Sequence, residues 1–539
     1  MIVPMSHVDL LCLSSEGDAT LSALRDLGAV HLDLSGATGA GVAEAKGEVA
    51  DAERALRLIV RARGKVGKDE LDIRVRGVAE VLATGADRDA LSAERDRLER
   101  EIKAYEPYGD FDPALAQRLL DRGIDIADRL PAKLPEMRLS KMREKLGRVV
   151  NRIAIDDAKL ASADDEAIMR MFPELADRVA FAAARELLEN RGAVSVVSGW
   201  IPTACADELR ACAAKMGWGM LLRDPAEGES PPTLIEPPKL FRPVKVLFSG
   251  LGIAPAYSES DVSVPFMCYF ALFFAMLVGD GGYGAIILAL TLVGWRRYRS
   301  AKSRSSLLRS WLTLLTVFSS ATIVWGLLSN TWFGAGLPFA DEWPTVKWLG
   351  DPSYNNMMFL CFTIGTTHLV LARLWNGICL INSTSCLPEF GWSGILVFMY
   401  FVVNAIVGIS SGVPSWSYWL FGVSILLVVS RTRGVALGML PLNIMSAMGD
   451  IISYVRLFAV GYASLQVARN FNAMALELDL PVWAKILPML IILLLGHGIN
   501  FALAGLSILV HAVRLNTLEF SNHKGLTWSG YAFSPFKRH

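Results

Sequence analysis

From residue 262 onward the chain is dominated by apolar segments, several of which are long enough to cross a lipid bilayer. A bilayer core of about 30 Å needs about 20 apolar residues in a helix. Because lipid offers no hydrogen-bond partners, such segments satisfy their backbone groups as helices. We predict eight transmembrane helices, the last two long and tilted, at 264–279, 282–297, 308–329, 356–378, 391–410, 415–430, 440–472 and 484–519.

The two halves of the chain differ in charge. Residues 1–261 carry 36 basic and 44 acidic side chains, whereas residues 262–539 carry 17 basic and 9 acidic ones. We therefore expect a charged N-terminal arm at 1–261 and a membrane domain at 262–539. Hydrophobic residues make up 53% of the chain, which is above the usual fraction for a soluble globular protein.

Composition also argues against several classes of protein. No basic block accompanies a recognisable nucleic-acid-binding module, so nucleic acid is not expected as a partner. The seven cysteines form no Cys-x-x-Cys pair, which argues against a disulfide framework or a zinc site. We expect neither a metal nor another cofactor. The N-terminus lacks a basic region followed by an apolar core, so no signal peptide is predicted and the arm is expected in the cytoplasm.

The pattern of the N-terminal arm indicates two small α/β lobes. Strands are predicted at 2–13 and 29–34 around a short helix, and at 193–197 and 217–222 around a helix at 204–216. Between the lobes, apolar residues recur at intervals of three and four, which predicts an antiparallel coiled coil, with an ordinary helical domain as the alternative. The residues of this seam are Val42, Ala45, Val49, Ala52, Leu56, Ile59, Leu91, Leu98, Ile102 and Tyr105.

Loop charges indicate the orientation of the membrane helices, because cytoplasmic loops are enriched in Lys and Arg. The predicted fold class is thus an α-helical polytopic membrane protein of the inner membrane, with a cytoplasmic α+β arm and a cytoplasmic C-terminus. Basic residues of the predicted internal side are Arg296, Arg297, Arg299, Lys302, Arg304, Arg309, Arg431, Arg433, Lys524, Lys537 and Arg538. Acidic residues of the predicted external loops are Asp341, Glu342, Asp351, Glu477 and Asp479.

Arg456 is the strongest candidate for a functional residue. It lies inside the apolar segment 440–472, where a charged side chain costs about 2.5–3.5 kcal/mol on insertion scales. Arginine does not deprotonate in proteins, so this side chain must face water, a carboxylate on another helix, or another subunit. Asp450 is the nearest acid in sequence, but on a regular helix it lies about 120° away around the axis.

A second set of polar residues follows the last predicted helix. Asn500, Ser507, His511 and Arg514 are spaced so that a regular helix places them within about 60° of one face. Such a stripe indicates the wall of a hydrated path. The alternative is hydrogen bonding between helices of a bundle.

Six further polar residues are weaker candidates, and most have an ordinary structural alternative. Asp280 lies in a glycine-rich turn, and an aspartate there often caps the turn. His368 and His497 lie in apolar helices, where histidines are often core residues. Glu519 lies near a helix exit, where a glutamate is often solvated. The six candidates are Asp280, His368, Asp450, Gln466, His497 and Glu519.

Five short motifs resemble one known family. The segment Ser-Tyr-Val-Arg-Leu at 453–457 resembles the family's Ser-Tyr-x-Arg-Leu, and 510–520 resembles its His-Ser-x-Arg-Leu followed by Glu-Phe. The other motifs are Pro-Phe at 265–266 with Gly-Asp-Gly-Gly-Tyr-Gly at 279–284, Gly-Trp-Ile-Pro at 199–202, and Pro-Pro-Thr at 231–233. In this order they resemble subunit I of bacterial and archaeal V/A-type rotary ATPases, the counterpart of the eukaryotic V-ATPase a subunit.

The resemblance implies a stator that couples proton or sodium translocation to rotation of a proteolipid ring, with ATP hydrolysis or synthesis on other subunits. It implies Arg456 as the essential cation and Arg514 as its support. Implied partners are the ring of K- or L-type proteolipids, the peripheral-stalk subunits E and G, the adaptor between central stalk and ring, and membrane lipid. Candidates to line its two half-channels are His511, Asn500, Ser507, Gln466, Asp280, Asp450, His368, His497 and Glu519.

Two other classes of protein remain as alternatives. An independent secondary ion transporter often has repeated membrane halves, and no convincing repeat is visible here. A membrane-anchored scaffold would not transport ions. The chain has no nucleotide-binding motif of its own, so it is not expected to carry out ATP chemistry.

Overall fold

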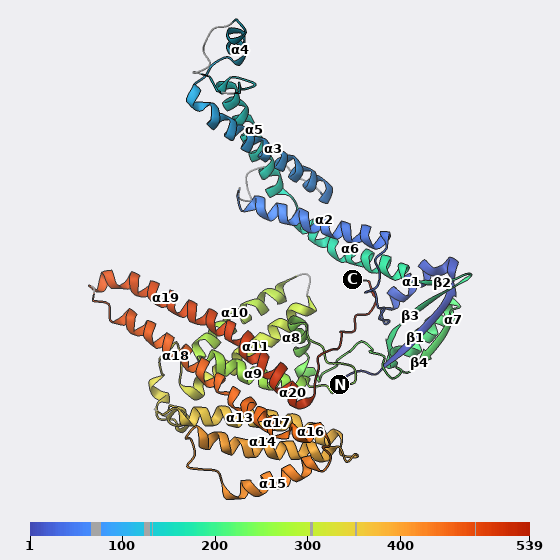
Figure 1. The fold of residues 1–539 in the computed structure, drawn as a ribbon, viewed down its shortest axis with the longest axis vertical. Coiled ribbons are helices and arrows are strands. Elements are labelled where there is room, and N and C mark those ends of the chain that lie inside the picture. The colour runs from blue at the N-terminus through green and yellow to red at the C-terminus, as the bar shows by residue number, and fades with distance from the viewer. Residues whose placement is uncertain are drawn as a thin grey trace. The chain divides into compact units, whose positions relative to one another are not determined.

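The computed structural model describes residues 1–65, 77–122, 130–131, 133–301, 305–350, 353–479 and 481–538. The chain forms two compact units, which are described separately (Figure 1). The arm unit comprises Pro4–Ala226 and Ser534–His539, and the helical unit comprises Met1–Val3 and Glu227–Phe533. Residues 227–261, assigned to the N-terminal arm from sequence, therefore group with the helical unit.

The arm unit contains one antiparallel sheet of four strands in the order β2-β3-β1-β4. The strands are β1 Met5–Leu13, β2 Glu189–Arg191, β3 Val194–Pro202 and β4 Gly219–Arg223. β1 pairs with β3 along its whole length and with β4 on its other edge. The prediction of two lobes is therefore wrong, because strands from both predicted lobes join one sheet. The strand predicted at 29–34 is reduced to a single bridge between His31 and Trp200.

Helices α1 (Gly17–Leu27) and α7 (Ala206–Met216) pack on this sheet. Both end at a glycine in the left-handed conformation, with φ of 63° at Gly28 and 72° at Gly217, which is the usual C-terminal cap. Their apolar residues share one core with the central strands. Core residues include Val8, Leu10, Leu21, Leu24, Val197, Leu209 and Ala213.

Long helices form the rest of the arm unit: α2 Ala40–Arg63, α3 Val78–Tyr105, α5 Leu139–Ser162 and α6 Asp165–Glu186, with the short α4 Pro113–Asp121. α2 packs on α6, and α3 packs on α5 (Figure 1). Ion pairs join Glu48 to Arg178 and Arg63 to Asp165, so α2 and α6 run antiparallel. The predicted apolar seam is buried at Val42, Ala45, Ala52, Ile59 and Leu98, and its other residues are partly buried.

The helical unit consists of α8 Val244–Leu251, α9 Ser263–Val278, α10 Gly281–Ser300, α11 Ser306–Ser329, α12 Pro344–Leu349, α13 Asn355–Cys379, α14 Cys386–Ile406, α15 Ser415–Val429, α16 Val435–Gly438, α17 Leu440–Ser453, α18 Val455–Leu476, α19 Val482–Ser507 and α20 Phe520–Lys524. Five helical segments of the described chain are long and apolar enough to cross a membrane, or six if α9 and α10, bent by 119°, form one span. α15 is apolar but shorter. All eight predicted segments are helical, but eight membrane crossings are not confirmed.

Asp280 holds the bend between α9 and α10. Its carboxylate accepts hydrogen bonds from the backbone N–H groups of Gly282 and Phe333, both at 2.8 Å, and of Gly334 at 2.9 Å. A Cβ at Gly282 would lie 2.6 Å from the Phe333 ring, so the loop can approach only a glycine here. This geometry supports the turn-capping interpretation of Asp280.

The two longest apolar segments are not regular helices. α17 and α18 are separated at Tyr454, where the Tyr454 N–H donates to Ile451 and the Leu457 N–H donates to Tyr454, in the tight pattern of a 3₁₀ turn. The last segment passes from α19 through two π-helical turns, Ile508–Ala512 and Leu515–Glu519, into α20. Each π turn shifts the register of the side chains that follow, and such turns are frequent at functional sites.

Candidate functional site

The two arginines singled out in the sequence meet at one carboxylate. Arg456, in the first turn of α18, has its Nη2 3.6 Å from Glu519 Oε1. Arg514, between the two π turns, has its Nε 3.4 Å from the same oxygen. Two permanent cations therefore share one acid, and the cluster keeps an excess positive charge even when that acid is ionised.

Glu519 is buried, so its interpretation as a solvated residue is wrong. Its side chain is 5% exposed, whereas those of Arg456 and Arg514 are 26% and 52% exposed. A buried carboxylate needs a compensating cation because an unpaired charge is costly in a medium of low dielectric constant. Arg456 thus finds a carboxylate on another helix, as its position demands, and still keeps part of its guanidinium exposed.

Two buried polar atoms beside this cluster have no hydrogen-bond partner among the described residues. They are Oε2 of Glu519 and Nδ1 of His511. Buried polar atoms in proteins normally have a partner, and ordered water often supplies it. Ser507 lies one turn before His511 and is half-buried. The surroundings of Glu519 therefore suit water inside the helical unit.

A second charged network joins α13, α14, α17 and α20, and sequence reasoning found only one of its members. His523 Nε2–H donates to Asp450 at 3.0 Å, and Arg373 Nε–H donates to His523 Nδ1 at 3.2 Å. Arg373 also contacts Glu389 at 3.2 Å. The signal for Arg373 was present, because it lies inside a predicted membrane segment as Arg456 does.

Asn500 and His497 belong to a hydrogen-bonded network between α10, α18 and α19. Asn500 Nδ2 donates to the Tyr283 hydroxyl at 3.0 Å, and His497 Nδ1 lies 2.8 Å from the same hydroxyl. Ser464 donates to Asn500 Oδ1 at 3.1 Å. Asn500 therefore joins helices by hydrogen bonds. This agrees with the alternative interpretation of the polar residues on the last predicted helix, namely hydrogen bonding within a helix bundle. After the first π turn, Arg514 instead lies beside Glu519.

Gln466 lies ten residues after Arg456 on α18. Its Nε2 donates to the Tyr462 hydroxyl at 2.6 Å, and this hydroxyl is 2.8 Å from that of Tyr354. A cavity of about 180 Å³ adjoins both tyrosines and Arg469. Gln466 thus has a polar environment that continues along the helix.

His368 of α13 lies in the core of the helical unit and is fully buried. Its Nδ1 shares a 2.8 Å hydrogen bond with the Tyr454 hydroxyl. Its ring stacks against Tyr269 and Phe520. These contacts agree with the alternative that His368 is a core histidine.

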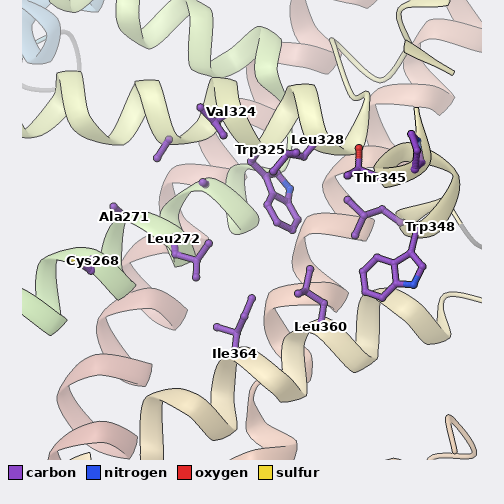
Figure 2. A pocket seen from close by; sticks show the side chains of 14 residues that line it. Cys268, Ala271, Leu272, Val324, Trp325, Leu328, Thr345, Trp348, Leu360 and Ile364 are labelled. Atoms are coloured by element: carbon purple, nitrogen blue, oxygen red, sulfur yellow. The ribbon is translucent and has the colours of Figure 1, made fainter. Parts of the chain in front are cut away.

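A larger pocket, of about 830 Å³, lies between α9, α11, α12 and α13 (Figure 2). Its walls are formed by apolar side chains such as those of Leu272, Trp325 and Leu360, with Cys268 and Thr345 as the more polar groups. None of the described residues that line this pocket is charged. Within the ranges that the structure describes, no group of three or more His, Cys, Asp or Glu side chains is arranged to hold a metal ion.

Comparison with known proteins identifies relatives along the chain, although no protein-family model matches it. Over its whole length the chain is 29% identical to V-type ATP synthase subunit I 1 of Treponema pallidum, whose full length is also covered. The chain is therefore a homologue of the subunit I proteins of V-type and A-type ATP synthases. It is also 32% identical to V-type ATP synthase subunit I of Borreliella burgdorferi, over 64% of this chain and 60% of that protein. The A-type ATP synthase subunit I of Methanocaldococcus jannaschii is 24% identical, over 63% of this chain and 54% of that protein.

These relatives confirm the resemblance that the short motifs indicated. In this subunit I homologue, the two motifs that contain Arg456 and Arg514 are more than fifty residues apart in sequence and converge on Glu519. The acid belongs to the second of these motifs, directly before Phe520. The motifs therefore mark one structural site.

Proposed function

We propose that this subunit I homologue is the membrane stator of a rotary V/A-type ATP synthase and couples proton or sodium translocation to ATP synthesis or hydrolysis. Residues 262–539 act as the ion-translocation domain, and the part of residues 1–261 that belongs to the arm unit holds the peripheral stalk. ATP chemistry takes place on other subunits. The observation that carries the proposal is the Glu519 carboxylate shared by Arg456 and Arg514 within two long apolar segments.

The charge of the cluster suits the task of a stator. A ring carboxylate crosses lipid in a neutral form, because an ionised group in hydrocarbon is costly. A cation within about 4–6 Å favours the ionised form of a carboxylate and hence release of its ion. Arg456 is this cation, because part of its guanidinium is exposed and can face the ring acid. Arg514 adds to the positive potential. Glu519 weakens the attraction, so that the ring acid can leave again.

The surface of the long helices supports a rotating apolar partner. Large apolar side chains on α17, α18, α19 and the two π turns are exposed, which is unusual unless lipid or another protein covers them. A long apolar surface with two cations complements a ring of helices that carry acids. Its exposed residues include Leu442, Met445, Met474, Leu476, Ile486, Leu490, Leu494, Leu503, Leu506, Leu509, Val510 and Leu518.

Two half-channels deliver the ion to and from Arg456 in this proposal. Asp450, His511 and Glu519 line the path toward the basic loops, and Gln466 lines the path toward the acidic loops. Asp280 and Asn500 are left out of these paths because backbone groups or neighbouring side chains already occupy their polar atoms.

The basic loops and the C-terminus are cytoplasmic in the proposal, in line with the enrichment of Lys and Arg on that side. Of the charges used for this assignment, Lys302, Arg304 and Asp351 lie outside the described residues. The proposed partners are the K- or L-type proteolipid ring, the peripheral-stalk subunits E and G, and the adaptor of the central stalk.

The test is to replace Arg456 in the complete complex and to measure ATP-driven ion uptake into liposomes. We expect Arg456→Ala to abolish uptake while the complex still assembles. Arg456→Lys should also be severely impaired, because a desolvated lysine loses its proton more readily than arginine does. Wild-type uptake by an assembled Arg456→Ala complex would falsify the proposal.

Arg469 provides the matched control, because it is an exposed arginine on the same helix. Arg469→Ala should retain most of the uptake. The purified chain alone is reconstituted in parallel. Ion transport by that chain without other subunits would favour an independent secondary transporter.

A further inference from the structure

His368 touches the neighbours of both charged residues that form the site. On one side its Nδ1 lies 2.8 Å from the hydroxyl of Tyr454, which stands two positions before Arg456. On the other side its ring stacks on Phe520, with centroids 4.5 Å apart and planes inclined by 12°. Phe520 directly follows Glu519. One side chain of α13 thus contacts a residue two positions before Arg456 and the residue directly after Glu519.

Tyr454 is fixed more firmly than a typical residue at a helix break. It is fully buried, and its ring packs edge-on against Phe273 at 5.9 Å. Gly365, one turn before His368 on α13, lies so close to this ring that a Cβ there would clash with Tyr454. α18 begins directly after Tyr454. The packing of the Tyr454 ring therefore fixes the position of the first turn of α18, which contains Arg456.

The imidazole ring of His368 is also held by stacking against two aromatic rings. Tyr269 of α9 stacks on the imidazole, with centroids 4.0 Å apart and planes inclined by 27°. Phe520 is fully buried at the start of α20, directly after Glu519, which ends the second π turn. Tyr269, His368 and Phe520 form a stack that fixes the carboxylate end of the pair.

We propose that His368 is a positioning residue that sets the distance between Arg456 and Glu519 through its hydrogen bond to Tyr454 and its stack on Phe520. This inference rests on the proposed function, since it assigns a mechanical role within that site. It also replaces the expectation that His368 lines an ion path. His368 acts through neighbouring residues and touches neither the ion nor the ring.

The choice of histidine at this position points to more than core packing. Its Nε2 is buried and has no hydrogen-bond partner among the described residues. An unsatisfied buried polar atom destabilises a protein, and phenylalanine would fill a stack without that cost. Among the described residues, the hydrogen-bond partner of His368 is Tyr454, and this bond accounts for a polar ring at a position where phenylalanine would also pack.

The test uses the complete complex in liposomes and measures ion uptake per ATP hydrolysed. Tyr454→Phe removes only the hydroxyl, and His368→Phe keeps an aromatic ring in the stack but removes both nitrogens. We expect each variant to lower coupled uptake about fivefold, the factor that one hydrogen bond of ordinary strength is worth. The double variant should be no worse than either single one, because both changes remove the same bond. His368→Gln, which can restore a hydrogen bond to Tyr454, should recover part of the coupling.

Tyr400→Phe is the matched control. Its hydroxyl also bonds to a residue of α13, Thr363, at 2.9 Å. This variant should keep wild-type coupling. Normal coupling in both His368→Phe and Tyr454→Phe would overturn the inference, and so would an equal loss in Tyr400→Phe. A loss in His368→Phe with normal Tyr454→Phe would instead make His368 part of an ion path.

The two proposals can fail separately. If Arg456→Ala abolishes uptake while the His368 and Tyr454 variants remain coupled, only the positioning role is wrong. If Arg456→Ala transports normally, the proposed stator function itself is wrong.

Discussion

Replacing Glu519 by glutamine tests whether the shared carboxylate sets the charge of the arginine cluster. The variant keeps the size of the side chain and removes its charge. At an effective dielectric constant of about 20, the 3.6 Å contact with Arg456 provides about 5 kcal/mol of direct attraction. The contact with Arg514 contributes less, about 1 kcal/mol, because that guanidinium is 52% exposed and screened by solvent.

The cost of burying the carboxylate offsets part of this attraction. Measurements on buried ion pairs indicate that removing one partner costs about 3–5 kcal/mol, because the other charge is left uncompensated. In Glu519→Gln, Arg456 loses its carboxylate partner and therefore attracts other anions more strongly. A passing ring carboxylate should then stay bound to Arg456 for longer. If only about 1.4 kcal/mol of this cost appears in the barrier for release, ion uptake falls about tenfold.

The assay compares ion uptake and ATP hydrolysis in the same liposomes, with assembly checked by subunit composition. Glu389→Gln is the control, because Glu389 also pairs with an arginine, Arg373, at 3.2 Å with both side chains 20% exposed. We expect at least a tenfold loss of uptake in Glu519→Gln and a much smaller loss in Glu389→Gln. Wild-type uptake in Glu519→Gln, or equal losses in the two variants, would refute the reasoning.

Three further predictions concern stability. Asp280→Ala leaves three backbone N–H groups without their acceptor and should lower the unfolding temperature of the purified protein, at about 1–3 kcal/mol per orphaned group. Arg63→Ala removes hydrogen bonds to Asp165 and to two backbone carbonyls at the junction of α5 and α6, so hydrogen exchange there should become at least tenfold faster. Burial lowers the pKa of His31, against the raising effect of a backbone hydrogen bond and a nearby aspartate. The contribution of neutral His31 to the free energy of unfolding is therefore complete above its ordinary pKa of about 6.5 and is lost as the pH falls toward the lowered pKa. Hydrogen exchange, corrected for intrinsic rates, should show this pH dependence in the wild type. His31→Gln should remove it.

Much of the helical unit was predictable because a single physical constraint governs it. Apolar stretches of sufficient length become helices in lipid, and each predicted stretch is helical in the structure. That Arg456 would pair with another group could be predicted in the same way, because a charge that cannot be neutralised by deprotonation must find a partner. The identity of that partner could not, because Glu519 lies 63 positions away in the sequence.

The arm unit shows where local patterns fail. Each strand–helix–strand segment resembled an independent lobe, but β1 and β3 pair along nine residues and share one core. Strand pairing between distant segments leaves no local signal, because alternation shows which side of a strand is buried but not which strand lies beside it. The helical seam was easier to predict, since its spacing depends on the geometry of one helix.

The sequence alone determined that residues 262–539 form apolar helices and that two arginines lie within them, because helix length and the cost of an unpaired charge depend only on local composition. Only the tertiary structure decided that both arginines share Glu519, that His523 rather than Arg456 binds Asp450, and that His368 contacts Tyr454 and Phe520. The break at Tyr454 and the π turns around Arg514 shift side chains away from the positions of a regular helix. Such shifts arise from packing between helices, which the spacing of residues along one helix does not encode.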